Sequence, residues 1–152
     1  MFTLGIKNQL VKTILVYAIL SVLLVCVNWI YGLFGHGVDS PYMTFMFLYS
    51  LLGGCLFYLA LYKSVPRLIE SRLFRIFYNL YNSGLAALIV GSLLTGILEI
   101  AGTGSDYQKY FFIGGFGLIG IAIMIMAFAI VLQKNADSQK KTKKQVKKIE
   151  IL

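Results

Sequence analysis

Residues 110–132 read YFFIGGFGLIGIAIMIMAFAIVL, a run with no Asp, Glu, Lys, Arg or His. A helix rises 1.5 Å per residue, so about 20 apolar residues are enough to cross a hydrocarbon core of about 30 Å. A surface helix of a soluble protein would instead carry polar residues on one face, at a period of about 3.6 residues. This run therefore predicts a membrane-spanning helix.

Three earlier runs have the same character: residues 13–34, 41–62 and 76–101. The run 13–34 is longer than the core of a usual signal peptide and no A-x-A cleavage site follows it, so we predict that it is a retained span. The composition, 59% hydrophobic and 13% charged, agrees with lipid as the solvent. We predict an all-α integral membrane four-helix bundle over residues 1–133, followed by a basic tail over residues 134–152.

The positive charges fall in alternate gaps between the four runs. Of the 14 Lys and Arg residues, only Lys109 lies in the gaps after the first and third runs. Positively charged loops stay in the cytoplasm. The pattern therefore predicts that both termini are cytoplasmic, and we expect a multi-pass protein of the plasma (inner) membrane.

Two sequences predict helix starts. In Asp39-Ser40-Pro41, a capping residue precedes a proline at the first helical position. Ser105-Asp106-Tyr107-Gln108 has the pattern of a capping box at the start of the fourth helix. Residues 64–75 mix apolar and basic side chains, and they fit either a separate interfacial helix or a direct continuation into the third span.

The third run contains small or polar residues at every fourth position. They are Asn79, Ser83, Ala87, Gly91, Thr95 and Glu99. Such a stripe lets another helix approach closely, with a right-handed crossing. It fits ordinary packing within the bundle or between protomers, and it also fits a polar groove for a ligand or a partner's helix.

Glu99 is an acidic residue inside a span, which makes it a functional candidate. A carboxylate is unfavourable at the C-terminal end of a helix, and Lys109 is equally unfavourable near the start of the next helix. A Glu99–Lys109 ion pair would offset both, so we predict that pair. The alternatives are proton or cation handling by Glu99 and contact with a partner subunit.

The residues expected at the outer face form a polar cluster. They are His36, Asp39, Glu99, Asp106 and Lys109. Their spacing matches no metal-binding motif, and Gly35-His36-Gly37 resembles a flexible turn, so we predict no metal site. A single histidine also excludes a bis-histidine haem within one chain, and we predict no cofactor.

Glycines are concentrated in the fourth run. Gly115 to Gly120 form a G-x-G-x-x-G sequence, but nucleotide binding requires a preceding strand, which an apolar span does not provide. We predict that Gly114, Gly117 and Gly120 flatten one face for close helix packing. Gly53-Gly54 in the second run are expected to do the same or to permit a bend.

The tail carries most of the remaining cations. They include Lys140, Lys141, Lys143, Lys144, Lys147 and Lys148. Next to a membrane such a cluster attracts anionic lipid headgroups. We therefore expect contact with membrane lipids rather than with nucleic acid.

The spans contain no catalytic triad, paired carboxylates, CxxC or phosphate loop. We therefore predict a non-enzymatic accessory, assembly or regulatory subunit that acts through helix–helix packing with a protein partner or as a homo-oligomer. One alternative is a small oligomeric carrier or channel with its pathway along the stripe from Asn79 to Glu99. The other is a binder of a lipid or another hydrophobic ligand.

Overall fold

The computed structural model describes the backbone of residues 2–34, 38–64 and 72–149, and the side chains of residues 9–34, 38–63 and 73–135. In this part of the chain the elements are the helices α1 (Phe2–Phe34), α2 (Pro41–Leu48), α3 (Phe57–Ser64), α4 (Arg72–Ile100) and α5 (Gln108–Ile149), and the π-helical segment η1 (Tyr49–Leu56) between α2 and α3. Because α2, η1 and α3 are continuous, they form one second span.

Four helical stretches are long and apolar enough to cross a membrane. They are Gln9–Phe34, Pro41–Lys63, Leu73–Ile100 and Gln108–Asn135. Their bounds agree within a few residues with the predicted spans. The prediction of an all-helical protein with four candidate membrane spans is therefore confirmed.

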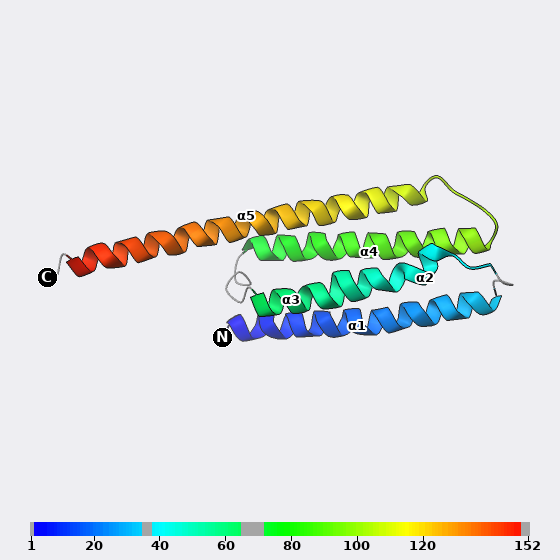
Figure 1. Ribbon diagram of the computed structural model, residues 1–152, viewed down its shortest axis with the longest axis horizontal. Coiled ribbons are helices and arrows are strands. Elements are labelled where there is room, and N and C mark those ends of the chain that lie inside the picture. The colour runs from blue at the N-terminus through cyan, green and yellow to red at the C-terminus, as the bar shows by residue number, and fades with distance from the viewer. Residues whose placement is uncertain (1, 35–37, 65–71, 150–152) are drawn as a thin grey trace.

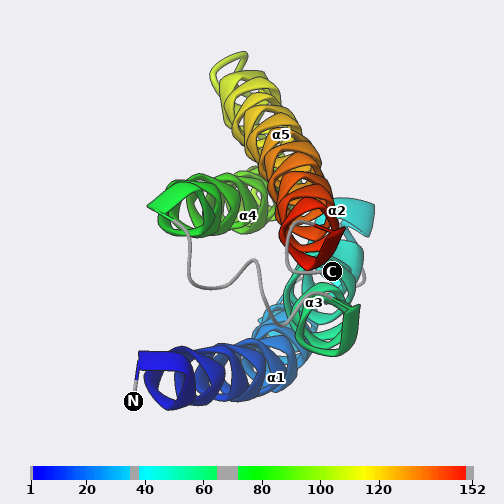
Figure 2. The ribbon, with the colours of Figure 1, turned by 90° about the vertical axis from the view of Figure 1, so that its left-hand side faces the viewer.

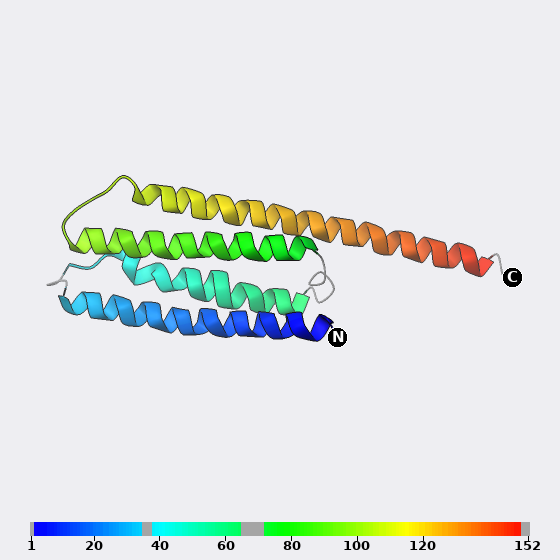
Figure 3. The same cartoon turned by 180° about the vertical axis from the view of Figure 1, so that it is seen from behind.

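The four spans run side by side and pack in the order of the chain (Figures 1 and 3). α1 packs against the second span, the second span against α4, and α4 against α5. The end view in Figure 2 places α1 and α5 at opposite edges of the molecule. Among the described residues, no Cα atom of α1 lies within 8 Å of one in α4 or α5. The bundle is therefore open rather than a closed ring.

One end of the molecule, where α1 and α4 begin and α3 ends, contains Lys12, Lys63 and Arg75, and we call it the basic end. The helix α5 is 42 residues long and extends well beyond the other helices there (Figure 1). The predicted boundary at residue 133 is thus a change of composition within one helix, because the backbone stays helical to Ile149.

The π-helical segment η1 contains Gly53 and Gly54 and is the least regular part of the spans. At its end, the N–H of Phe57 donates to the carbonyl of Leu52, five residues earlier, as a π-helix requires. A Cβ on Gly53 would lie 2.6 Å from Leu85 of α4, and one on Gly54 would lie 2.2 Å from the ring of Tyr17 on α1. The two glycines therefore permit close contact with the helices on both sides.

The helix ends follow the sequence in part. α2 begins at Pro41 as predicted, with Ser40 at the N-cap position, but the Ser40 side chain accepts no bond from the first turn, so the predicted side-chain cap is wrong. α4 begins at Arg72, so residues 72–75 continue into the third span, while residues 65–71 lie outside the described part. At the other end of α4, Gly102 has a φ of 69° and donates to Glu99 O, and Thr103 N donates to Leu98 O, which together form a Schellman cap.

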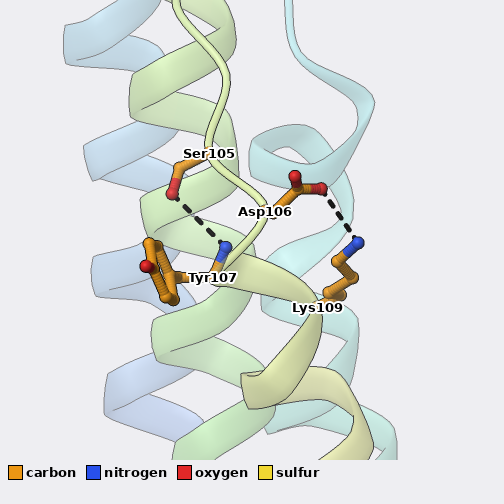
Figure 4. Close-up of polar contacts among 4 residues, drawn as sticks. All are labelled: Ser105, Asp106, Tyr107 and Lys109. Carbon is orange, nitrogen blue, oxygen red and sulfur yellow. Dashed lines mark hydrogen bonds and ion pairs between the residues drawn. The ribbon is translucent and has the colours of Figure 1, made fainter.

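The start of α5 differs from the prediction. Its first residue is Gln108, and Ser105 Oγ accepts a hydrogen bond from Tyr107 N at 3.3 Å (Figure 4). A capping box would need the bond to come from the residue three positions after the serine. The predicted box is therefore wrong, because the chain forms a local turn before the helix begins.

Candidate functional site

The stripe on α4 is divided between exposed and buried positions. Asn79, Ser83 and Glu99 are exposed, Ala87 is half-buried, and Gly91 and Thr95 are buried. A Cβ on Gly91 would lie 2.8 Å from Cβ of Phe111 in α5, and Thr95 Oγ1 donates to Gly91 O at 2.8 Å. The middle of the stripe is thus used for packing within the chain, so one copy does not present it as a continuous open groove.

Glu99 contacts a different residue from the one predicted. Its carboxylate accepts a hydrogen bond from Ser40 Oγ, which joins the start of α2 to the end of α4. Lys109 Nζ lies 2.9 Å from Asp106 Oδ1, and both side chains are exposed (Figure 4). The predicted Glu99–Lys109 pair is wrong. Lys109 pairs with Asp106 because Asp106 lies one turn before it. Glu99 is bonded by Ser40, whose side chain caps no backbone N–H of α2.

The predicted outer-face cluster is only partly assembled. His36 lies outside the described residues, and Asp39 is exposed. Among the described residues, no three His, Cys, Asp or Glu side chains come together in a way that could hold a metal ion. The side chains of the six tail lysines, from Lys140 to Lys148, are also outside the described part.

The glycine that packs α5 against α4 is Gly115. A Cβ on Gly115 would lie 2.7 Å from Leu88 Cδ2, and one on Gly84 would lie 2.8 Å from Gly115 O. Gly114, Gly117 and Gly120 have nothing within 4 Å of the same position. Within the chain the packing face is that of Gly115, which is turned by one residue, about 100°, around the helix from Gly114. That Gly114, Gly117 and Gly120 form a face for close packing stays a prediction.

Two faces of α5 therefore repeat at spacings of three and four residues. The face against α4 is buried and contains Gly115, Ala122, Met126 and Ala129. A second face is exposed along the span, and we call it the open face of α5: Gly114, Gly117, Gly120, Ile121, Met124 and Phe128. This three-four spacing is the one that lets two helices pack along a common seam.

A second candidate site is the groove between α1 and α4. It has a cavity of about 420 Å³, within the roughly 300–1,000 Å³ typical of small-molecule pockets. α1 contributes Gln9, Lys12, Thr13, Val16, Tyr17 and Leu20, and α4 contributes Tyr78, Asn82, Ala86 and Ile89. A neighbouring cavity of about 320 Å³ shares Gln9 and Tyr78 and adds Arg75. We call the two together the α1–α4 groove.

Hydrogen bonds between side chains bridge α1 and α4 beside this groove. Thr13 Oγ1 and Tyr78 Oη are 2.7 Å apart, and Tyr17 Oη donates to Asn82 Oδ1 at 2.7 Å. Tyr58 Oη of α3 donates to the same Asn82 oxygen at 2.8 Å. Asn82 is therefore the residue at which three spans meet.

The sequence interpretation missed this network, although a signal for it is present. Thr13, Tyr17 and Ser21 recur at every fourth position of α1, and all three are buried. Polar residues inside a span face protein or a cavity rather than lipid. That spacing could have identified the face of α1 that turns inward, but its partner Asn82 lies beside the α4 stripe rather than in it.

Comparison of the chain with protein-family models, with curated proteins and with solved structures finds no match. The class that the fold defines is that of a polytopic helical membrane protein with four candidate spans.

Proposed function

We propose that this protein is an accessory, assembly or regulatory subunit of a larger membrane complex and that a helix of a partner subunit packs on the open face of α5. The observation that carries the proposal is the set of empty positions beside Gly114, Gly117 and Gly120. Among the described residues, α4 is the only helix with Cα atoms within 8 Å of Cα atoms of α5. The open face is therefore available along the whole span.

Physical arguments favour a helix as the occupant. Apolar side chains do not drive association in lipid, so helix pairing depends on close approach at small residues. In water, each glycine inside a helix costs about 1 kcal/mol relative to alanine. Gly115 offsets this cost by its contact with α4, whereas Gly114, Gly117 and Gly120 make no such contact within the chain. A partner helix on the open face would supply it.

The test is purification of the tagged full-length chain from its native membranes in a mild detergent. We expect a stoichiometric partner polypeptide or a second copy to co-purify, and Gly117→Leu to abolish the association. Val22→Phe is the control, because it also enlarges an exposed side chain within a span but lies on α1. A wild-type chain that isolates as a monomer, or a complex that survives Gly117→Leu, would contradict the proposal.

In the proposed orientation the protein spans the plasma (inner) membrane with its basic end on the cytoplasmic side. This orientation is supported by the concentration of Lys and Arg at that end, including the tail lysines that we propose contact anionic headgroups. A cysteine introduced by Thr103→Cys, near the opposite end, is expected to react with a membrane-impermeant thiol reagent added to intact cells. If it reacts only after the cells are permeabilised, the proposed orientation is contradicted.

The alternative of a carrier or channel is tested separately. Gly91 and Thr95 are buried within the chain, so a pathway along the stripe would need a rearrangement of α5. Ion or proton flux in reconstituted vesicles that is abolished by Glu99→Gln would favour transport over the subunit role.

A further inference from the structure

The α1–α4 groove changes character along its length. Lys12 and Arg75 lie at its basic end, and Thr13 and Tyr78 follow. The bonded pairs Thr13–Tyr78 and Tyr17–Asn82 have the same sequence separation, so α1 and α4 run parallel in constant register. Farther from the basic end, the lining is Leu20, Ala86 and Ile89. The groove is thus cationic at one end, polar in the middle and apolar at the other.

Several polar groups in the groove lack a partner among the described residues. Asn82 Oδ1 accepts from two tyrosine hydroxyls, whereas no described residue accepts a hydrogen bond from its Nδ2. Neither Lys12 nor Arg75 has an acidic side chain within 4.0 Å in the described part. An amide N–H without a partner is costly away from water. A ligand with acceptor oxygens and a negative charge would therefore gain on entering the groove.

We propose that the α1–α4 groove binds an anionic phospholipid. Its phosphate lies between Lys12 and Arg75, and its ester oxygens lie within reach of Asn82 Nδ2. One acyl chain follows the apolar lining beside Ala86 and Ile89. This site is separate from the open face of α5 and does not depend on the proposed subunit role.

Charge complementarity selects the anionic lipid over a zwitterionic one. A zwitterionic headgroup brings its own cation close to Lys12 and Arg75, whereas an anionic headgroup leaves both attractions unopposed. The second span packs against both α1 and α4, no Cα pair between α1 and α4 is within 8 Å in the described residues, and the hydrogen-bonded pairs fix the spacing of the two helices. The groove is thus already formed before a lipid enters, which lowers the cost of binding.

The test is native mass spectrometry of the delipidated full-length chain, titrated with phosphatidylglycerol and in parallel with phosphatidylcholine. We expect one tightly bound phosphatidylglycerol and at least tenfold weaker phosphatidylcholine. Lys12→Gln and Arg75→Gln should each weaken phosphatidylglycerol binding roughly fivefold. Lys63→Gln is the matched control, because Lys63 is an exposed cation at the same end of the molecule that does not line the groove.

A second variant tests the groove without changing a charge. Ala86→Phe fills the apolar part, and we expect it to abolish the tight phosphatidylglycerol while the helical circular-dichroism spectrum is unchanged. Equal weakening by Lys63→Gln and Lys12→Gln would overturn the proposal, because it would show general attraction to the basic end. Equal affinity for the two lipids, or tight binding that survives Ala86→Phe, would also overturn it.

Discussion

The contact between Gly54 and Tyr17 gives the sharpest prediction for stability. Gly54 lies in the π-helical segment, and an added Cβ would be 2.2 Å from Cγ and 2.3 Å from Cδ1 of the Tyr17 ring. Non-bonded carbon atoms prefer separations of about 3.5–4.0 Å, so either the ring or the backbone must move by about 1 Å or more. Gly54→Ala is therefore expected to disturb the junction of α1 with the second span.

The size of the effect follows from two contributions. Overpacking in a well-packed interior costs typically about 1–3 kcal/mol. Displacing Tyr17 also weakens the 2.7 Å hydrogen bond from its hydroxyl to Asn82, and such a bond contributes about 0.5–1.5 kcal/mol. We expect Gly54→Ala to lower the free energy of unfolding by about 2–4 kcal/mol.

The assay is denaturation by sodium dodecyl sulfate in mixed micelles, followed by near-ultraviolet circular dichroism of the clustered tyrosines. Gly120→Ala is the matched control, because it makes the same substitution within a span where nothing lies within 4 Å of the added atom. The control is expected to be at least as stable as the wild type. If Gly54→Ala unfolds at the same midpoint as Gly120→Ala, the close packing of η1 against Tyr17 is refuted.

Three further predictions concern single contacts. Gly84→Ala would place its Cβ 2.8 Å from the carbonyl oxygen of Gly115, so it should lower stability by about 1–3 kcal/mol, and an unchanged unfolding midpoint would contradict the α4–α5 crossing. Ser92 has a buried hydroxyl without a partner in the described structure, so Ser92→Ala should raise stability by about 1 kcal/mol in the same assay, whereas a loss would indicate a bond to that hydroxyl. Ser40→Ala removes the donor to Glu99 and should cost about 1 kcal/mol, and in a double-mutant cycle Ser40→Ala/Glu99→Ala should cost less than the sum of the two single substitutions, whereas additive losses would contradict this bond.

The sequence was sufficient for the spans because their hydrophobicity is a local property. Each span can be recognised from its own residues, so residues 41–62 and 110–132 needed no knowledge of their neighbours. The start of α2 at Pro41 was equally local, because the proline acts within the first turn, whereas the contact of the Ser40 side chain with Glu99 was not. The basic stretch before the third span was ambiguous, and the structure shows that α4 includes residues 72–75.

The candidate sites depend on which face of each helix turns inward, and the sequence does not determine this rotation. Gly114 and Gly115 are neighbours, yet one faces open space and the other contacts Leu88. Two acidic residues, Glu99 and Asp106, lie near Lys109 in the sequence, and the nearer one, Asp106, forms the ion pair. Asn82 connects three spans because it accepts hydrogen bonds from the hydroxyls of Tyr17 on α1 and Tyr58 on α3, and both residues are distant from it in the sequence.

The most direct test of the open face of α5 is native mass spectrometry of the complex ejected from native membrane vesicles. For the wild type we predict the mass of the 152-residue chain plus one further polypeptide or a second copy. For Gly117→Leu we predict the free chain alone, with the Val22→Phe control retaining the complex. A wild-type chain that appears only as a free monomer would contradict the proposed subunit role.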